Sequence, residues 1–161
     1  MENPILGRHA VRKFKPAAVT ETAVDQLVAA IEAAPCGMHQ VEDMAGVVVT
    51  DPALRETIEA ASNNACYGAP LLFAIATKND SSFGDRDASA AAENIMVQAA
   101  ALNLGSVYVM SGALALNDHP EILSQLGIDQ GYSLSVIVAV GQAAEPAAVP
   151  DRTHRYKLIR R

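Results

Sequence analysis

The stretch RDASAAAENIMVQAAALNLG (residues 86–105) fixes the plan of the fold, because it predicts one long helix. It is rich in residues of high helix propensity, and Gly105 follows as the expected stop signal. Its apolar residues cover much of the helix circumference, which a lone surface helix would not tolerate. We therefore expect this helix to lie in the core or at a subunit interface.

Apolar segments on both sides of this helix are predicted to form strands. LLFAIAT (71–77) and LSVIVAV (134–140) are almost continuously apolar, which is typical of strands covered on both faces. GVVVT (46–50) and SVYVM (106–110) are shorter strand candidates. The sequence therefore predicts a sheet with two central strands.

Further helices are expected between these strands. TETAVDQLVAAIEAAP (20–35) has an apolar stripe at helical spacing, Thr22 and Asp25 resemble a capping box, and Pro35 ends the run. Residues 52–61 and a segment near His119 also carry helical patterns. With 161 residues, half of them apolar, the chain is expected to form one α+β domain over residues 1–161, a sheet wrapped by helices.

Charge is distributed unevenly along the chain. The net charge is −6, but residues 16–151 hold three Lys and Arg against 17 Asp and Glu, and both ends are cationic. If the ends meet in the fold, they form a local anion site on a protein whose overall field repels nucleic acid. The alternative is that both ends are solvated tails. A nucleic-acid-binding dimer that uses its basic tails is the weakest interpretation.

The sequence gives no sign of export or of a membrane span. It lacks a signal-peptide pattern, and no apolar run approaches the roughly 20 residues that cross a bilayer. Cys36 and Cys66 are too few and too isolated for a disulfide framework, so a cytoplasmic location is expected. Cys36 and His39 have half-site spacing for zinc, but no second pair completes a site, so no metal is expected.

Residues 143–161 are predicted to leave the domain as a C-terminal arm. QAAEPAAVPDR (142–152) is an extended departure from the body, and the YKLIRR segment that ends the chain is apolar enough to dock. A frayed tail is one interpretation. The other is exchange of the arm with a second subunit, which points to a symmetric homodimer.

Six segments, in order, resemble the nitroreductase family of flavin enzymes. These are RHAVRKF, AAPCGMHQVEDMAGVVVTD, YGAP, D-x5-EN-x4-AA-x-L-x-LGS, YSLSVIVAVGQ and the proline-then-arginine ending. The resemblance spans essentially the whole chain. It implies a three-layer α+β fold with a mostly antiparallel central sheet, and a homodimer that binds FMN at the subunit interface.

The resemblance also implies roles for particular residues. Arg8 and Arg152 would bind the FMN phosphate, since the planar guanidinium fork can hold two phosphate oxygens. Arg12 would reach the flavin pyrimidine edge, where a cation stabilises the reduced ring. His9 and Ala10 would lie along the same edge through backbone contacts. Asn63 or Asn64 would also lie near that edge.

Two further segments are implied to reach the flavin. The turn with Pro35, Cys36, Gly37 and His39 would contribute to the flavin site of the neighbouring subunit. Cys36 is interpreted as a small thiol in a serine's place, with a nucleophile as the alternative. The backbone N–H of Met110 or Ser111 would lie near flavin N5, with an ordinary strand end followed by a turn as the alternative.

The function implied by the resemblance is hydride transfer from NADH or NADPH through FMN to a small organic acceptor such as a nitroaromatic or a quinone, by a two-step exchange. No catalytic side chain is needed. Six family positions are substituted: Ala10, Cys36, His39, Val41, Asp43 and Ala45. The alternative is therefore a flavin-binding protein of the same fold with lost or redirected redox activity. The short KNDSSFGDRD segment (78–87) predicts an open site with little selectivity.

Overall fold

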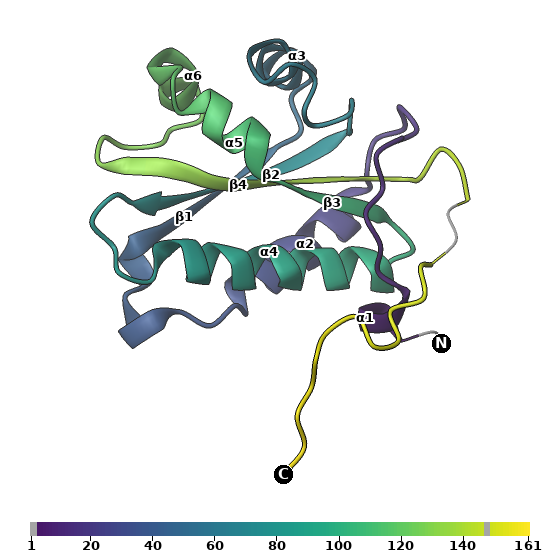
Figure 1. Cartoon of the computed structure of the whole chain (residues 1–161). Helices are drawn as coiled ribbons and strands as arrows, with labels where there is room; N and C mark the ends of the chain where they lie inside the picture. The colour runs from purple at the N-terminus through teal and green to yellow at the C-terminus, as the bar shows by residue number, and fades with distance from the viewer. Residues whose placement is uncertain (1–2, 147–148) are drawn as a thin grey trace.

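A computed structural model, which describes residues 3–146 and 149–161, has a four-stranded antiparallel sheet between two helical layers (Figure 1). The strands are β1 (Met44–Val49), β2 (Leu71–Lys78), β3 (Gly105–Val109) and β4 (Tyr132–Gly141), in the order β1-β2-β4-β3. Each neighbouring pair is antiparallel. The two continuously apolar segments form the central strands β2 and β4, so the predicted α+β class and the burial of these strands are confirmed.

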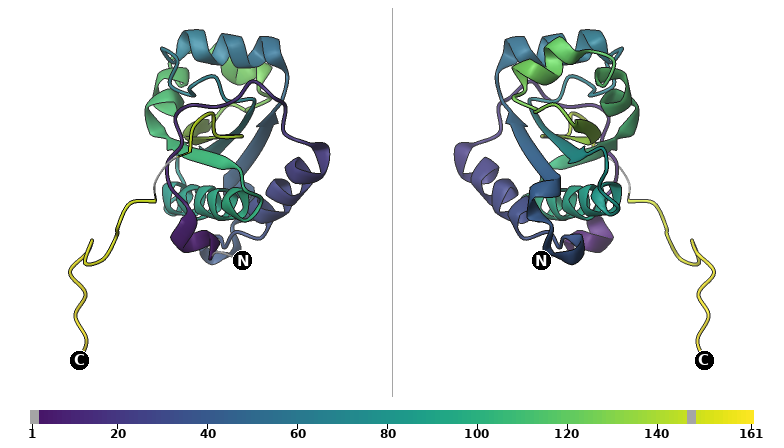
Figure 2. Two further views of the ribbon diagram at one scale, coloured as in Figure 1. Left: turned by 90° about the vertical axis from the view of Figure 1, so that its right-hand side faces the viewer. Right: turned by 90° about the vertical axis from the view of Figure 1, so that its left-hand side faces the viewer.

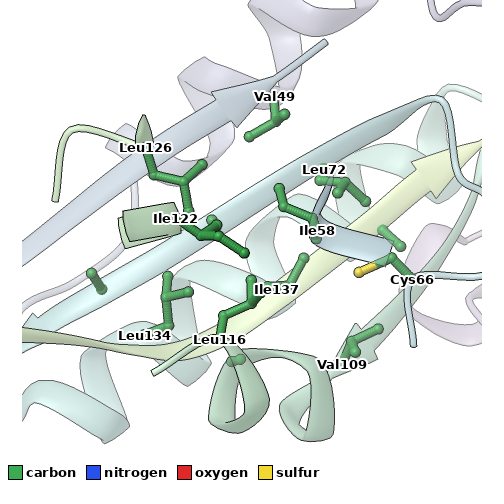
Figure 3. Close-up of a cluster of buried hydrophobic side chains, with 14 of the residues drawn as sticks. Val49, Ile58, Cys66, Leu72, Val109, Leu116, Ile122, Leu126, Leu134 and Ile137 are labelled. Atoms are coloured by element: carbon green, nitrogen blue, oxygen red, sulfur yellow. The ribbon is translucent and has the colours of Figure 1, made fainter. Parts of the chain in front are cut away.

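Side chains alternate between two cores, one on each face of the sheet. Phe73 and Val138 point toward α2 (Glu21–Glu32) and α4 (Gly84–Ala101). Leu72 and Ile137 point toward α3 (Pro52–Ala61), α5 (Met110–Leu116) and α6 (Pro120–Gln125). Figure 3 shows the second core, where Ile58, Leu116 and Ile122 close over the strands. The three layers follow from this alternation.

The long helix α4 lies in the core, which was one of the two predicted locations. Eight of its residues are buried, including Ala91, Ile95 and Ala99. The expectation that Gly105 stops the helix is wrong. The helix ends at Ala101, Asn103 adopts a left-handed backbone (φ 56°), and Gly105 is the first residue of β3. A β-carbon at Gly105 would lie 2.7 Å from Val11, so this glycine allows a close approach of the chain.

Two local predictions need correction. The predicted capping box at Thr22 and Asp25 is not used, because α2 begins one turn earlier and Thr20 accepts a hydrogen bond from the Ala23 N–H at 3.4 Å. The segment after β3 was expected to be a strand end and a turn, but Met110 is the first residue of α5. The tertiary setting decides both boundaries, since Met110 and the residues after it pack onto β4 as a helix.

The two ends of the described chain lie beside the same edge of the sheet. Ala10 pairs with Ser106 of β3, and Phe14 pairs with Ala143 just beyond β4. The predicted extended departure at Gln142 therefore begins later, since the Lys15 N–H still donates to the Gln142 carbonyl at 2.8 Å. Residues 149–161 then run away from the body of the molecule as an extended arm (Figures 1 and 2).

Candidate functional site

The cationic segment near the N-terminus is held along β3 by a short helix. Asn3 caps α1 (Pro4–Gly7) by accepting from the Ile5 N–H at 3.0 Å, and Pro4 supplies the first helical residue. The chain then becomes extended, and the Val11 N–H donates to the Ser106 carbonyl at 3.0 Å. Arg8 and Arg12 therefore project from a backbone whose path is fixed by the sheet.

Arg152 brings the other cationic end to this segment. Its Nη1 donates to the Leu6 carbonyl at 2.8 Å, and its Nη2 donates to the Arg8 carbonyl. These bonds join positions 146 and 144 residues apart in the sequence. The two cationic ends thus meet in one place, as the anion-site interpretation of the charge pattern requires.

The guanidinium groups at this place keep unused donors. Arg8 Nε lies 3.0 Å from Glu93 Oε1 of α4, as an ion pair without the geometry of a hydrogen bond. The Nε atoms of Arg8 and Arg152 are both buried and make no hydrogen bond within the described part of the chain. Arg12 is exposed and makes no ion pair with any described residue. Because one carboxylate faces three arginines, the cluster has an excess of positive charge that suits an anion with several oxygens.

A cavity of about 590 Å³ opens beside this cluster. Its lining includes Arg8 and His9 from the N-terminal segment, Ala100 from α4, Ser106 from β3 and Glu145 from the start of the arm. His9 is turned toward its own backbone, with Nδ1 3.1 Å from the Gly7 carbonyl oxygen. The cavity therefore contains Arg8 and His9, while the remaining predicted site residues lie outside its lining.

The turn of residues 35–39, called the 35–39 turn below, lies near the opposite end of α4 (Figure 1). Its backbone is unusual, because Met38 and His39 are both left-handed (φ 53° and 58°) within η1 (Gly37–His39). The Gly37 N–H donates to both carboxylate oxygens of Asp87, at 3.1 and 3.0 Å. Pro35 and His39 are exposed and Cys36 is half-buried, so the turn presents its side chains outward.

The two thiols have different surroundings, and both are free. Cys66 is buried between α3 and β2, and this burial, with Glu59 nearby, raises the pKa of its thiol to about 12. Cys66 therefore stays protonated and inert at neutral pH. Cys36 makes no hydrogen bond with a basic side chain in residues 3–146 and 149–161, which agrees with its interpretation as a small thiol rather than a nucleophile.

Met110 and Ser111 stand at the junction of β3 and α5, with no loop between the two elements. The first backbone N–H groups of a helix have no intrahelical partners, so these two residues offer free amides. Both residues are exposed, Met110 to 57%. The loop that carries Asn63 and Asn64 lies beside the same helix, since a β-carbon on Gly112 would be 3.2 Å from that of Ala65.

Within one chain, the predicted site residues form two groups. Arg8, His9, Ala10, Arg12 and Arg152 gather beside β3, and Met110 and Ser111 follow at the end of that strand, about 13 Å along it. The 35–39 turn is separate. The 14 residues of α4 from Asp87 to Ala101 place it about 20 Å from the cavity end of that helix.

A sequence model of the nitroreductase family matches residues 49–142. The chain belongs to the nitroreductase family. No curated protein sequence matches it significantly. The match includes all of β2, α4, β3 and β4, but neither the cationic segment near the N-terminus nor Arg152.

Solved structures show that this nitroreductase-family chain has the fold of the family. A nitroreductase with bound FMN from Bacteroides fragilis NCTC 9343 superposes with a TM-score of 0.83 at 21% identity, covering 98% of this chain and 97% of that one. A nitroreductase with bound FMN from Desulfitobacterium hafniense DCB-2 gives 0.84 at 20%, covering 99% and 100%. An FMN-dependent nitroreductase from Clostridium difficile R20291 gives 0.80 at 23%, covering 98% and 97%.

Sequence reasoning about this family member missed three acidic residues near the site. Glu93 pairs with Arg8, Asp87 binds the 35–39 turn, and Glu59 accepts hydrogen bonds from the N–H groups of Cys66 and Gly68. The D-x5-EN segment contains two of them, Asp87 and Glu93, so the sequence held a signal. Their partners are 50 or more residues away and follow only from the fold.

Proposed function

We propose that this protein is an FMN-dependent oxidoreductase that transfers a hydride from NADH or NADPH to a small organic acceptor, such as a nitroaromatic or a quinone. The observation that carries the proposal is the meeting of Arg8 and Arg152, whose buried Nε atoms have no hydrogen-bond partner among the described residues. An arrangement of this kind favours a phosphate group. Family membership and the FMN-bound solved structures of the same fold agree with it.

The residues present fit FMN. Arg8 and Arg152 would hold its phosphate, and the exposed Arg12, farther along the same segment, would face the pyrimidine edge. His9 and Ala10 would contribute backbone contacts between them. The free amides of Met110 or Ser111 would lie near N5, at the other end of β3.

We further propose that the complete site needs a second copy of the chain. The 35–39 turn lies too far along α4 to join the arginines of its own chain, so it would serve the flavin of the partner. The arm supports this, since Tyr156 and Leu158 are 73% and 86% exposed and have no apolar partner among the residues described. Exchanged arms would cover these side chains in a homodimer.

The chemistry is supplied by FMN when it is bound, because its ring accepts a hydride and passes it to a second molecule. The chain's part is to bind and to orient. Arg12 provides a positive charge where negative charge develops, and the fixed amides after β3 provide a dipole without a titrating side chain. No side chain is assigned the role of a general acid or base.

Acceptor selectivity is expected to be low, because little of this chain covers the site. Only residues 79–83 connect β2 to α4, and within them the Ser81 N–H closes a tight turn onto the Lys78 carbonyl. No helix stands there to form a lid. We therefore expect small planar acceptors of several kinds to be reduced.

The second candidate is a flavin-binding protein with lost or redirected redox activity. One substituted position favours it, because Asp43 is engaged in structure: its Oδ1 receives a hydrogen bond from Lys78 Nζ at 3.0 Å. A family position that carried an aromatic side chain now anchors β2 to η2 (Val41–Asp43). The flavin environment would be more polar there.

The visible spectrum separates the two candidates. The purified protein is mixed with FMN, passed through gel filtration and then treated with NADH or NADPH without oxygen. We expect retained flavin absorbance that bleaches. Retained flavin that never bleaches supports the second candidate, and the absence of retained flavin contradicts both.

Among the described residues, no helix is long and apolar enough to cross a membrane. The cytoplasmic location, the absence of a nucleic-acid partner and the absence of a metal stay predictions from the sequence.

A further inference from the structure

Asp87 is a buried carboxylate whose partner is a single backbone group. It lies in the first turn of α4 and is 8% exposed. Both of its oxygens accept from the Gly37 N–H, and no Lys, Arg or His of the described chain forms an ion pair with it. A buried carboxylate is unfavourable unless it is hydrogen-bonded, so its presence in the core layer calls for a specific reason.

The 35–39 turn does not hold its own shape. Cys36 precedes η1 without a side-chain cap, and the turn's own hydrogen bond runs from the Gln40 N–H to the Gly37 carbonyl at 3.0 Å. Met38 and His39 adopt left-handed backbones that residues with side chains disfavour. The conformation must therefore be imposed from outside the turn.

Helix α4 imposes it through two contacts at one residue. Asp87 binds the N–H of Gly37, and Phe83 packs so closely on the other side that a β-carbon at Gly37 would lie 2.3 Å from its ring. Gly37 is thus fixed between a carboxylate and an aromatic ring. Cys36 and His39, on either side of Gly37, inherit their placement from these contacts.

We propose that Asp87 is a positioning residue that holds the 35–39 turn in the shape needed to contact FMN in the partner subunit. The inference rests on the proposed function, because it assumes that this turn reaches a flavin. It adds a residue that would not touch the flavin and would act through Gly37. The rigid core position of α4 makes that hold independent of the flavin itself.

The test compares Asp87→Ala and Asp87→Asn with the exposed control Asp80→Asn, which removes a nearby acid that makes no hydrogen bond with a described residue. Hydrogen exchange of the Gly37 amide is measured in flavin-free full-length protein, and FMN affinity is measured by flavin fluorescence. We expect Asp87→Ala to exchange at least tenfold faster at Gly37 and to bind FMN about tenfold more weakly.

Asp87→Asn keeps one acceptor oxygen and should recover part of both effects, and Asp80→Asn should match the wild type. If Asp87→Ala does not fold, as core α4 amides would report, Asp87→Asn carries the comparison. Unchanged exchange at Gly37 in both Asp87 variants overturns the proposal. So does faster exchange with unchanged FMN affinity and an unchanged flavin absorbance maximum, because Asp87 would then be only structural.

Failure of the proposed function gives a different result. A wild-type protein that binds no FMN removes the flavin role of the turn, and with it the role assigned to Asp87. Faster exchange at Gly37 would in that case still report the hold of Asp87 on the turn.

Discussion

The two ends of α4 contact parts of the chain built in opposite ways. Near its C-terminal end, the cationic cluster depends on charge: Arg8 and Arg152 come from segments 144 residues apart and meet through backbone carbonyls. At its N-terminal end, the 35–39 turn depends on shape, with a strained backbone held by Asp87 and Phe83. Neither end is a complete site by itself.

This difference indicates how each region should respond to change. A charge cluster should be sensitive to salt and to the loss of a guanidinium, because its attraction is electrostatic. A shaped turn should be insensitive to salt and sensitive to added volume, because its neighbours are already in contact. Each prediction below tests one side of this contrast.

The largest effect should come from removing the arm. A chain ending at Glu145 loses Arg152 but keeps the pairing of Ala144 with Lys13, and a chain ending at Thr153 keeps Arg152 but loses the apolar residues. We expect the shorter chain to lose FMN affinity roughly hundredfold and to become monomeric. Gel filtration with flavin absorbance measures both properties.

The chain ending at Thr153 separates the two roles of the arm. It should keep most of the contact between Arg152 and the N-terminal segment while its dimer weakens. A chain ending at Glu145 that stays dimeric and yellow would show that the arm is a tail with no part in the site.

Single arginine substitutions should have the next largest effect. Arg8→Ala or Arg152→Ala should weaken FMN binding about tenfold to thirtyfold, and lysine at either position should recover only part, since it lacks the planar fork. Riboflavin, which has no phosphate, should bind these variants and the wild type alike. Lys157→Ala on the arm is the control, and equal losses for FMN and riboflavin would argue against a phosphate role.

Added volume tests the shaped end of α4. Gly37→Ala places a β-carbon 2.3 Å from the Phe83 ring, so it should destabilise the fold by about 1–3 kcal/mol. The double variant with Phe83→Ala should cost less than the sum of the single changes, because the clash is removed. Urea denaturation measures these values, and strict additivity would contradict the contact.

The smallest effect should be a pH dependence near the same turn. The Ser81 hydroxyl and then the Lys78 ammonium hold the pKa of Asp43 below its usual value of 3.8. A lowered folded-state pKa gives a contribution to stability that is present above pH 3.8 and is lost as pH falls through the folded value. The difference in urea midpoint between wild type and Asp43→Asn should therefore be constant near neutral pH and shrink below about pH 4.

The basic side follows from the same pair. Asp43 raises the pKa of Lys78, so the contribution of Lys78 should persist up to its usual value of 10.5 and be lost as pH rises through the folded value. Lys78→Met should show this loss already at neutral pH. Equal acid and base profiles for the wild type and both variants would mean that the pair contributes nothing.

Much of the fold could be predicted because local pattern and tertiary packing agree. The continuous apolar runs of β2 and β4 can be satisfied only between two layers, and the alanine-rich α4 has nowhere to go but the core. The boundaries were harder. Asn103 rather than Gly105 terminates α4, because the glycine is needed where Val11 crosses β3.

The site could be predicted only in part, for a physical reason. The meeting of the cationic ends leaves a trace in composition, since opposite ends of an acidic chain carry the same unusual charge. The bond from Gly37 to Asp87 leaves no such trace, because a backbone N–H has no side chain to signal it. The α5 start at Met110 was missed because Met, Ser and Gly carry no helix-start pattern.

The pairing of Phe14 with Ala143 closes a loop of nearly the whole chain. Contacts between such distant positions carry a high entropic cost of loop closure and form slowly during folding. We expect the sheet and α4 to become ordered first, and the anion-binding corner to mature last. A newly made molecule would then pass through a stage in which it is folded yet unable to take up its ligand.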